Sequence, residues 1–368
     1  MYVRFLRPLL FLLDAESSHK LILLLLRLLY WVPGAGALVR LLVGRLTEPL
    51  PTRVMGLDFP NPLGLAAGMD KDARCPRAWA DLGFGWVELG TVTPEPQPGN
   101  AGRRIFRLPR HRALINRLGF PSVGVKRFTQ NLGHGRKRGI VGINIGKNRD
   151  TPIARAADDY LNAMRAVYPY ADYIAVNISS PNTSQLRELQ KEDYLDTLLA
   201  TLKNEQIMLG KTRRHYVPLA IKIAPDLNDE ELDTVAGLLL KHKFDAVIAT
   251  NTTVERPGLE EELLAAENGG LSGRPLKDRS TATIRKLYNR LQGEIPIIGV
   301  GGIENAADAW EKMVSGADLI QIYTAFVYQG PAVIRHIVRG LRRRVKASGY
   351  TTLEEALEKA RSGIHLMR

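Results

Sequence analysis

The stretch Tyr173-Ile-Ala-Val-Asn177-Ile-Ser-Ser180-Pro-Asn182-Thr183 begins as an apolar run and ends abruptly in amide and hydroxyl side chains. This change is typical of a buried parallel strand that delivers polar groups to a site at its carboxyl end. Asn177 and Asn182 each supply a hydrogen-bond donor and an acceptor, which suits a planar ligand with amide and carbonyl edges. Taken alone, the stretch is equally compatible with a strand followed by a simple turn.

Apolar runs with polar ends recur along the chain. We expect eight strands, near Leu63–Ala67, Trp86–Thr91, Val141–Gly146, Tyr173–Ile178, Leu219–Ile223, Ala246–Thr250, Ile297–Val300 and Leu319–Tyr323. Segments with helical spacing lie between most of them, such as Asp158–Val167, Tyr194–Leu202, Glu230–Leu240 and Thr281–Leu291. Eight strands that alternate with helices predict an α/β fold, a (β/α)8 TIM barrel. An open, doubly wound sheet is the alternative, but no Gly-x-Gly-x-x-Gly motif opens the first helix.

Polar residues at the ends of these strands are site candidates, because the active site of such a barrel lies where strands end and loops begin. They are Ala67-Gly68-Met69-Asp70-Lys71, Thr91, Asn144, Asn177 to Asn182, Lys222, Thr250-Asn251-Thr252, Gly301-Gly302 and Tyr323-Thr324. Each residue by itself is explained equally well as the cap of a strand. The convergence of so many amides, hydroxyls and lysines on one rim favours a binding site.

Glycines end the seventh predicted strand in Gly299-Val-Gly-Gly-Ile303, and Tyr323-Thr-Ala325 ends the eighth. Glycine lets backbone N–H groups approach a phosphate, which in barrels also lies near a short helix N-terminus. The segment Gly270-Leu-Ser-Gly-Arg274 is a candidate to fold over the same group. We therefore expect a mononucleotide-type cofactor rather than a dinucleotide, with a plain turn as the alternative.

Lys222 lies inside the apolar strand Ala220-Ile-Lys-Ile-Ala224. An isolated buried charge is very costly, so the ammonium must meet an anion or a polar cavity. One interpretation is a structural ion pair with a barrel carboxylate. The other places the ammonium beside a cofactor that gains negative charge, such as a flavin reduced at its N1 side.

Together these motifs resemble class 2 dihydroorotate dehydrogenase, the quinone-linked flavoenzyme family of pyrimidine biosynthesis, and the resemblance spans nearly the whole chain. The stretches that carry it are Asn61–Lys71, Gly90–Asn100, Asn116–Phe120, Gly142–Lys147, Asn177–Asn182, Ile248–Thr252, Gly270–Pro275 and Gly299–Ile303. Class 1 relatives are soluble and carry cysteine at the position of the catalytic base, where this chain has Ser180. The resemblance therefore implies oxidation of dihydroorotate to orotate, with FMN as hydride acceptor and a quinone as final acceptor, in UMP biosynthesis.

The resemblance also assigns roles to individual residues. FMN is expected near Ala67, Gly68, Thr91, Asn144, Asn177, Lys222, Thr250, Gly273, Gly302, Tyr323 and Thr324. Dihydroorotate contacts are expected at Lys71, Asn116, Arg117, Leu118, Gly119, Phe120, Asn177, Asn182, Asn251 and Thr252. Ser180 is implied as the catalytic base, while Arg107 and Tyr323 are implied near the path of the quinone, ubiquinone or menaquinone.

A serine base requires help, because a free hydroxyl is a poor base and serine is not among the usual general bases. No histidine lies near Ser180 in the chain. We expect a relay through water or a hydroxyl such as that of Thr183, in a dry site beneath a lid formed by residues 181–189. The sequence does not determine that relay.

The first forty residues differ from the remainder in their apolar runs. Val3–Leu13 and Leu21–Val32 are apolar, and the second is interrupted by Arg27. Neither reaches the roughly 20 apolar residues of a membrane span. We expect residues 1–45 to form short helices on a membrane surface that admit the quinone, followed by a barrel over 46–368. A signal peptide, or a helical hairpin packed on the barrel or on another subunit, is the alternative.

The composition sets outer limits on function and location. The net charge is +13, and the single cysteine, Cys75, is expected in a helix after Lys71. A chain without disulfides suits a reducing compartment, and its basic excess favours anionic lipid. We expect a peripheral protein on the cytoplasmic face of a bacterial inner membrane. The seven histidines show no metal-ligand spacing, and the basic clusters 136–138 and 342–344 lack the interleaved aromatics of a nucleic-acid site.

Two other functions compete with this interpretation. A soluble flavin dehydrogenase that uses a nicotinamide or fumarate is disfavoured by Ser180 and by the apolar N-terminus. A non-catalytic membrane-binding barrel would need neither Lys222 in a strand nor a rim of amides.

Overall fold

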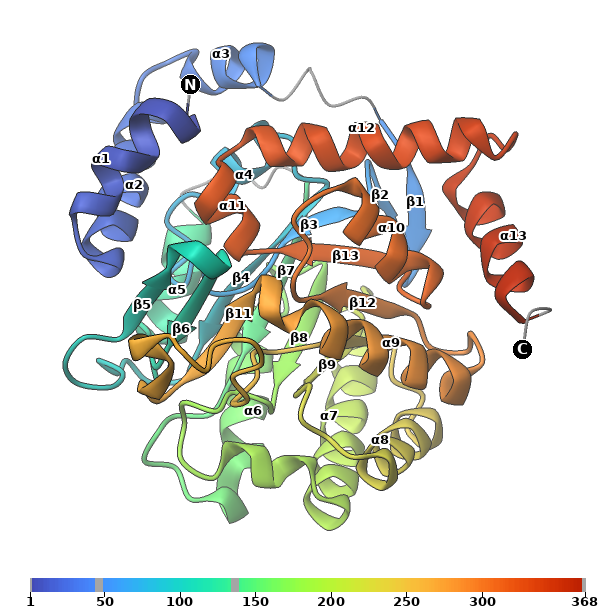
Figure 1. Ribbon diagram of the computed structural model, residues 1–368. Helices are drawn as coiled ribbons and strands as arrows, with labels where there is room; N and C mark the ends of the chain where they lie inside the picture. The colour runs from blue at the N-terminus through green and yellow to red at the C-terminus, as the bar shows by residue number, and fades with distance from the viewer. Residues whose placement is uncertain (1, 44–48, 134–138, 366–368) are drawn as a thin grey trace.

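The computed structural model describes residues 2–43, 49–133 and 139–365, and its centre is a closed barrel of eight parallel strands (Figure 1). Around the barrel the strands are β3 (Leu63–Leu65), β4 (Trp86–Val92), β7 (Ile140–Ile145), β8 (Tyr173–Asn177), β9 (Leu219–Ile223), β10 (Ala246–Ala249), β12 (Ile297–Val300) and β13 (Leu319–Ile322). The pairing of β13 with β3 closes the ring. The predicted TIM barrel is confirmed, and every predicted strand coincides with one of these eight.

Helices surround the barrel as the alternation predicts (Figure 1). They are α4 (Pro76–Asp81), α5 (Gly124–Gly133), α6 (Ala156–Val167), α7 (Glu192–Arg213), α8 (Asp229–Lys241), α9 (Lys277–Leu291), α10 (Ala306–Val314), α11 (Thr324–Gln329), α12 (Ala332–Ala347) and α13 (Leu353–His365). Local sequence explains where several begin: Asn228 and Glu231 form a capping box at α8, and Asn305 caps α10. Helix α7 is much longer than the apolar spacing predicts, and its second half includes the buried amide of Gln206, which donates to the Val217 carbonyl.

The amino end of the barrel is filled by aromatic rings. The Trp86 ring lies 5.7 Å from those of Phe59 and Tyr173, both at edge-on angles. Gly64 and Gly142 make room for these rings, since a Cβ would lie 2.2 Å from the Trp86 ring and 2.0 Å from the Tyr173 ring, respectively. A hairpin of β1 (Thr52–Val54) and β2 (Leu57–Phe59) contributes the Phe59 side chain. This aromatic plug leaves the carboxyl end of the barrel for a ligand.

A small antiparallel sheet lies beside the carboxyl end of the barrel, and the sequence did not predict it. It consists of β5 (Ile105–Leu108), β6 (Ala113–Asn116) and β11 (Gly270–Gly273), in the order β11-β6-β5. Its strands come from the connections after β4 and after β10, which are far apart in the sequence. The pairing of Gly270 with Asn116 brings two predicted motifs together.

The N-terminal segment lies along one side of the barrel, beside β5 and α11 (blue in Figure 1). It contains a π-helical turn (Tyr2–Leu6), α1 (Arg7–Leu12), α2 (Ala15–Leu29) and α3 (Ala35–Leu42). It is fastened by polar contacts: the Tyr2 hydroxyl donates to the Val327 carbonyl at 2.6 Å, and Arg107 donates to the Leu13 carbonyl at 2.7 Å. The alternative prediction, a helical hairpin packed on the barrel, is therefore correct for part of this segment.

The outer face of the same helices is apolar. Leu12 is 83% exposed and Trp31 is 74% exposed, and Phe5, Leu9, Leu24 and Leu28 are exposed as well. Among the helices in the described part of the chain, none combines the length and apolarity needed to cross a bilayer. The predicted domain boundary at residues 45–46 and the basic cluster 136–138 lie outside the described residues.

Two local predictions need correction. Cys75 is not inside a helix: it precedes α4, which begins at Pro76, because proline is favoured in the first turn. The polar residues from Glu16 to Lys20 do not separate two apolar helices. They belong to α2, whose first turn is capped by the Asp14 carboxylate, an acceptor for the N–H groups of Glu16 and Ser17.

Candidate active site

The largest concentration of predicted site residues surrounds one cavity at the carboxyl end of the strands, which we name the rim cavity. It encloses about 1200 Å³, including its open mouth. The predicted residues that line it are Ala67, Gly68, Lys71, Thr91, Asn116, Leu118, Gly119, Phe120, Asn177, Ser180, Asn182, Lys222, Thr250, Asn251, Thr252, Gly273, Gly302, Tyr323 and Thr324. Strand ends and the β5-β6-β11 sheet thus supply one continuous wall.

A chain of amides and hydroxyls joins the ends of the adjacent strands β4, β7 and β8 to Asn251, which follows β10. The Thr91 hydroxyl donates to Asn144 Oδ1 at 2.5 Å, and Asn177 Nδ2 donates to Thr91 Oγ1 at 3.2 Å. Asn177 Oδ1 in turn accepts from Asn251 Nδ2 at 3.3 Å. Because each side chain orients the next, the wall offers amide groups in fixed directions, as recognition of a planar ligand requires.

Ser180 is almost completely buried, and its Oγ accepts the backbone N–H of Asn182 at 3.3 Å. Asn182 Nδ2 reaches across to Asn116 Oδ1 at 3.0 Å, so the β8 loop is tied to the small sheet. No histidine lines the rim cavity among the described residues. Thr183 follows on the same loop; its Oγ1 is buried and has no hydrogen-bond partner among the described residues.

Lys71 lies on the loop after β3 and places its ammonium at the rim cavity, where Nζ donates to the Gly68 carbonyl at 2.7 Å. Burial lowers the pKa of Lys71 to about 8, and the nearby carboxylates of Asp72 and Glu16 oppose that shift. The lysine is therefore still mostly charged at neutral pH. A buried cation of this kind suits a carboxylate ligand.

Lys222 forms the structural ion pair that one interpretation of the sequence predicts, and its place beside a cofactor stays a prediction. Its ammonium lies 3.7 Å from the Glu88 carboxylate, a structural ion pair, and the same side chain lines the rim cavity. Glu88 itself is fully buried and accepts hydrogen bonds from Asn144 Nδ2, the Tyr173 hydroxyl and Gln321 Nε2, each at 2.8 Å. Burial and the Glu88 charge raise the pKa of Tyr173 well above its usual value, so this phenol stays a donor.

Sequence reasoning missed Glu88 and Gln321. Both interrupt apolar strands as Lys222 does, and that signal was available in Trp86–Val92 and Leu319–Ile322. Gln321 lines the rim cavity, and its Oε1 is a buried acceptor without a partner among the described residues. A ligand with an N–H edge would satisfy this acceptor, since unpaired buried polar atoms are rare in native proteins.

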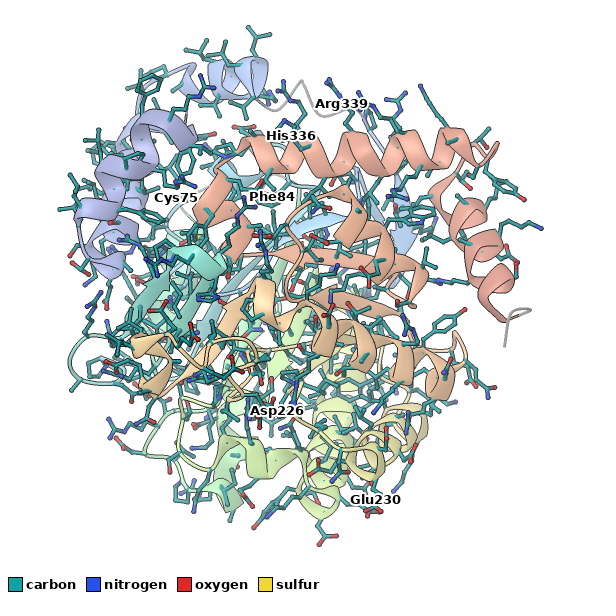
Figure 2. The ribbon with its side chains drawn as sticks, viewed as in Figure 1. Cys75, Phe84, Asp226, Glu230, His336 and Arg339 are labelled. Carbon is teal, nitrogen blue, oxygen red and sulfur yellow. The ribbon has the colours of Figure 1, made fainter. Side chains whose placement is uncertain are left out.

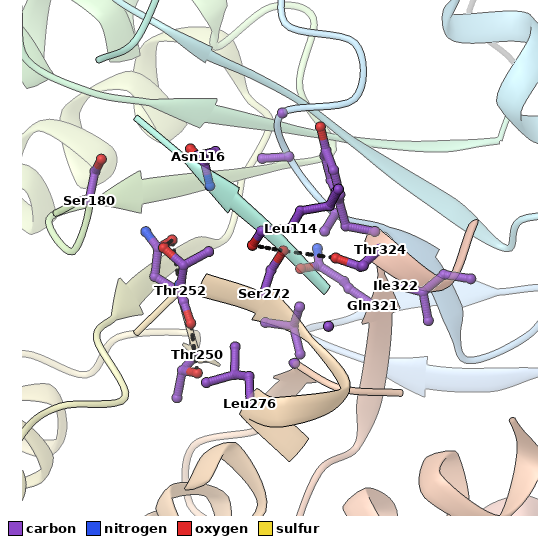
Figure 3. A pocket seen from close by; sticks show the side chains of 18 of the residues that line it. Leu114, Asn116, Ser180, Thr250, Thr252, Ser272, Leu276, Gln321, Ile322 and Thr324 are labelled. Carbon is purple, nitrogen blue, oxygen red and sulfur yellow. Dashed lines mark hydrogen bonds between the residues drawn. The ribbon is translucent and has the colours of Figure 1, made fainter. Parts of the chain in front are cut away.

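The opposite end of the rim cavity is built from glycines and hydroxyls. Figure 3 shows Ser180 on one side of the cavity, and Leu276 and Thr324 away from it on the other. Ser272, from the candidate segment Gly270–Arg274, exchanges a hydrogen bond with Thr324 at 2.8 Å (Figure 3). Gly302 has φ +71°, and a Cβ there would lie 2.4 Å from Lys277 Cα, so only glycine fits. Gly302 lines the rim cavity without a side chain, which suits the approach of an anionic group such as a phosphate to its backbone.

Of the residues to which the family resemblance assigns individual roles, three lie outside this wall. Asn144 is buried behind Thr91 and Asn177 and acts on the cavity through them. Arg117 pairs with Glu267, and its guanidinium lies 4.7 Å from the centre of the Phe106 ring. The Arg117 side chain is therefore directed away from the rim cavity. Arg107 lines a second cavity instead.

That second cavity, which we name the N-terminal cavity, lies between α1–α2 and the barrel and encloses about 1180 Å³ with its mouth. Its walls are mainly apolar: Leu6, Leu10, Phe11, Ile22, Leu25, Leu26, Leu29, Met69, Trp79, Leu82 and Phe326. Ile105, Leu114 and Tyr323 belong to both cavities, so the two adjoin. Arg107 and His19 are among the polar residues that line the N-terminal cavity. Burial and then the Lys71 charge lower the pKa of His19 to about 3, which keeps the ring neutral.

Comparison with known proteins places the chain in a family. The family model described as dihydroorotate dehydrogenase matches residues 49–345. A protein from Nitrosomonas eutropha named dihydroorotate dehydrogenase (quinone) is 53% identical over 94% of this chain and 98% of its own length. Its counterpart from Nitrosomonas europaea, with the same name, is 52% identical over 95% of this chain and all of its own length.

Solved structures agree with these sequence relatives. A dihydroorotate dehydrogenase from Eimeria tenella, crystallised in complex with ferulenol, superposes with a TM-score of 0.85 at 36% identity, covering 94% of this chain and 95% of its own. The ligand-free form of the Eimeria enzyme superposes with a TM-score of 0.84. The chain therefore belongs to the dihydroorotate dehydrogenase family, and within it to the quinone type that the sequence motifs resemble.

Proposed function

We propose that the protein oxidises dihydroorotate to orotate, with FMN as hydride acceptor and a membrane quinone as final electron acceptor, in de novo pyrimidine biosynthesis. The observation that carries the proposal is the contact between two unlike cavities. The rim cavity has a polar wall that ends at Ser180, and the apolar N-terminal cavity meets it at Tyr323. A soluble acceptor would need no apolar cavity of this size.

The residues present fit FMN. The partnerless Gln321 Oε1 and the Lys222 ammonium face the rim cavity on its barrel side, as a flavin ring with N–H and carbonyl edges would require. Gly273, Gly302 and Thr324 would hold the phosphate at the far end, while Ala67, Gly68, Thr91, Asn144, Asn177, Thr250 and Tyr323 would hold the remainder. When bound, FMN supplies a two-electron acceptor.

Ser180 would take the proton from carbon 5 of the substrate. Its Oγ is a buried acceptor at the rim cavity, and the partnerless hydroxyl of Thr183 lies three residues along the same loop. A water between these hydroxyls would carry the proton onward, since the rim cavity contains no histidine among the described residues. Arg187 holds the loop closed by donating to the Ser179 and Thr252 carbonyls at 3.2 and 3.1 Å.

Lys71 and the amides of Asn116, Asn182 and Asn251 would orient dihydroorotate. The lysine would pair with the substrate carboxylate, and the amides would read the donor and acceptor edges of its ring. Thr252 and the backbone of Leu118–Phe120 complete this side of the cavity. Fixed orientation of this kind converts a bimolecular step into an effectively intramolecular one.

The quinone would occupy the N-terminal cavity, with its head towards Tyr323, Arg107 and the neutral His19 ring. The exposed leucines of α1 and α2 would rest on the membrane as a peripheral anchor, on the cytoplasmic face of a bacterial inner membrane. Residues 1–45 would then form the quinone entrance and residues 46–368 the catalytic barrel.

The visible spectrum of the purified protein tests cofactor and substrate together. We expect a yellow protein that releases FMN on extraction and bleaches on anaerobic addition of dihydroorotate. A decylated quinone should then restore the colour. FAD in the extract, or a flavin that NADH bleaches and dihydroorotate does not, would contradict the proposal.

A further inference from the structure

A third cavity lies on the other side of α2 and takes no part in the proposed reaction. It runs between α2, the residues around the start of α4, and Arg127 and Asn131 of α5, and encloses about 1060 Å³ with its open mouth. Arg27, Arg74, Arg77 and Arg127 line it together with Tyr30 and Trp31; we name it the arginine groove. Cys75 lies on its inner side, where Sγ is 3.4 Å from the Leu23 carbonyl, close to the N-terminal helices in Figure 2.

The arginine groove has a clear excess of positive charge. No aspartate or glutamate lines it among the described residues. Arg74 is partly balanced by Asp72 at 2.9 Å, whereas Arg127 donates to the neutral Gln130 Oε1 at 3.2 Å. Guanidinium groups present planar pairs of donors that match phosphate oxygens, so arginines gathered from separate elements favour a phosphate-bearing ligand.

The position of the groove indicates which phosphate-bearing ligand it takes. Arg27 lies one helical turn before Trp31, and on the wheel of α2 it borders the face that carries Leu24 and Leu28. Those two leucines are 52% and 49% exposed, and Trp31 is 74% exposed. Tryptophan is enriched at membrane interfaces, at the level of lipid headgroups. A ligand whose phosphate is held in the groove would thus have apolar surface directly beside it.

We propose that the arginine groove binds the phosphate of an anionic phospholipid, whose acyl chains lie against the exposed leucines of α2. The inference rests on the membrane association proposed above and adds a defined headgroup site to it. A general attraction of a basic protein to a negative surface would not require arginines from α2, α5 and the loop before α4 to line one cavity. The groove would fix how the N-terminal cavity faces the bilayer.

A monomeric lipid offers no charged membrane surface, so its binding tests directly for a defined headgroup site. Dihexanoylphosphatidylglycerol, kept below its critical micelle concentration, should bind the full-length holoenzyme with one-site saturation in calorimetry. The variant Arg27→Gln/Arg127→Gln should weaken this binding about 10- to 30-fold, since each basic residue near a lipid phosphate contributes about 1 kcal/mol. Both side chains are exposed, so folding should be unaffected. Dihexanoylphosphatidylcholine should bind much more weakly to every form.

The matched control removes the same charge elsewhere. Lys211→Gln/Arg213→Gln alters two exposed residues at the end of α7, an element far from α2 in Figure 1. It should bind the monomeric lipid like the unaltered protein. Equal losses in the two variants would show that only overall charge matters and would overturn the inference. Displacement of the lipid by equimolar inorganic phosphate would also overturn it, in favour of a soluble phosphate site.

Vesicles separate this inference from the proposal on which it rests. The unaltered protein should bind phosphatidylcholine vesicles, and bind them more tightly when phosphatidylglycerol is included. If it binds neither kind, the membrane association itself fails. If the unaltered protein binds both kinds of vesicle but the groove variant keeps the full preference for phosphatidylglycerol, the headgroup site is overturned and the membrane association stands. Bleaching by dihydroorotate should be unchanged in both variants, which confirms that the rim cavity is intact.

Discussion

The rim cavity and the N-terminal cavity share three wall residues but differ in nearly everything else. Amides, hydroxyls and two lysines line the first, and its polar groups are tied to one another and to Glu88 by hydrogen bonds. Leucine, isoleucine and aromatic side chains line the second, with few polar groups. The first is built on barrel strands, whereas the second exists only because two helices lie against the barrel.

This difference indicates how one chain handles two substrates of opposite polarity. A polar substrate requires fixed donors and acceptors, and a rigid barrel supplies them. An apolar quinone requires mainly apolar surface, which non-directional packing of helices supplies. Tyr323, Ile105 and Leu114 form the shared wall, where electrons would pass from one side to the other. The comparison predicts that each cavity is damaged by a different kind of substitution.

The largest effect should come from Ser180→Ala. Loss of general-base help typically costs roughly 10²–10⁴-fold in rate. The flavin should remain bound, because Ser180 lies on the side of the rim cavity away from Leu276 and Thr324. Anaerobic stopped-flow bleaching by dihydroorotate measures the rate. Ser180→Cys should retain some activity. Ser184→Ala, an exposed hydroxyl on the same loop, is the matched control; equal rates for it and Ser180→Ala would remove Ser180 from the mechanism.

Lys222→Met should show how far the rim cavity depends on its buried charges. Removing one partner leaves the fully buried Glu88 carboxylate uncompensated, which typically costs about 3–5 kcal/mol. The double variant Lys222→Met/Glu88→Gln should recover part of that loss in urea unfolding. The flavin midpoint potential should fall in Lys222→Met, because the ammonium would stabilise the reduced ring. Lys241→Met, at an exposed ion pair with Asp196, is the control and should change neither quantity appreciably.

The N-terminal cavity should respond to lost apolar surface and not to lost charge. Deletion of residues 1–40 should leave bleaching by dihydroorotate intact but abolish vesicle binding. Turnover with a long-tailed quinone should fall about 10²-fold, since each buried CH₂ contributes about 0.8 kcal/mol. A small water-soluble acceptor should be affected less. Intact turnover with the long-tailed quinone would show that these helices serve only as packing material.

A point variant tests the same cavity in the full-length chain, so its result does not depend on the folding of the truncated protein. Ile22→Trp fills the N-terminal cavity while α2 stays in place. It should raise the KM for a long-tailed quinone and leave the dihydroorotate half-reaction unchanged. A rise in the KM for dihydroorotate instead would indicate that the two cavities are not separate in function.

The smallest effect should be a pH dependence at the rim cavity. Burial places the pKa of Lys71 at about 8, so the fraction of charged lysine falls as the pH rises through that value. Because the charged form would bind the substrate carboxylate, KM for dihydroorotate should increase about tenfold per pH unit above 8. Lys71→Arg should bind substrate less well but lose this dependence. A pH-independent KM in the unaltered protein would exclude Lys71 from carboxylate binding.

The barrel and most of its polar rim could be predicted from the sequence alone. Strands such as Tyr173–Asn177 and Leu219–Ile223 are buried on both faces, so they appear as short apolar runs, and the polar residue after each run must lie at the carboxyl end. This pattern alone predicts Ser180 and Asn182 at the rim, where both line the rim cavity. Local patterns suffice because strand direction and strand end are local properties.

Other features were decided by the tertiary structure. The small sheet joins Asn116 to Gly270, which are 154 residues apart, and four-residue strands give little periodic signal. Helix α2 places leucines on its outer face, His19 against one cavity and Arg27 against another, and a linear apolar run does not reveal which side meets the barrel. The sequence by itself determined the barrel and the chemistry of its rim, since both depend on burial along single strands. Only the tertiary structure decided the Glu88–Lys222 pair and the two cavities beside α2, because they depend on contacts between distant segments.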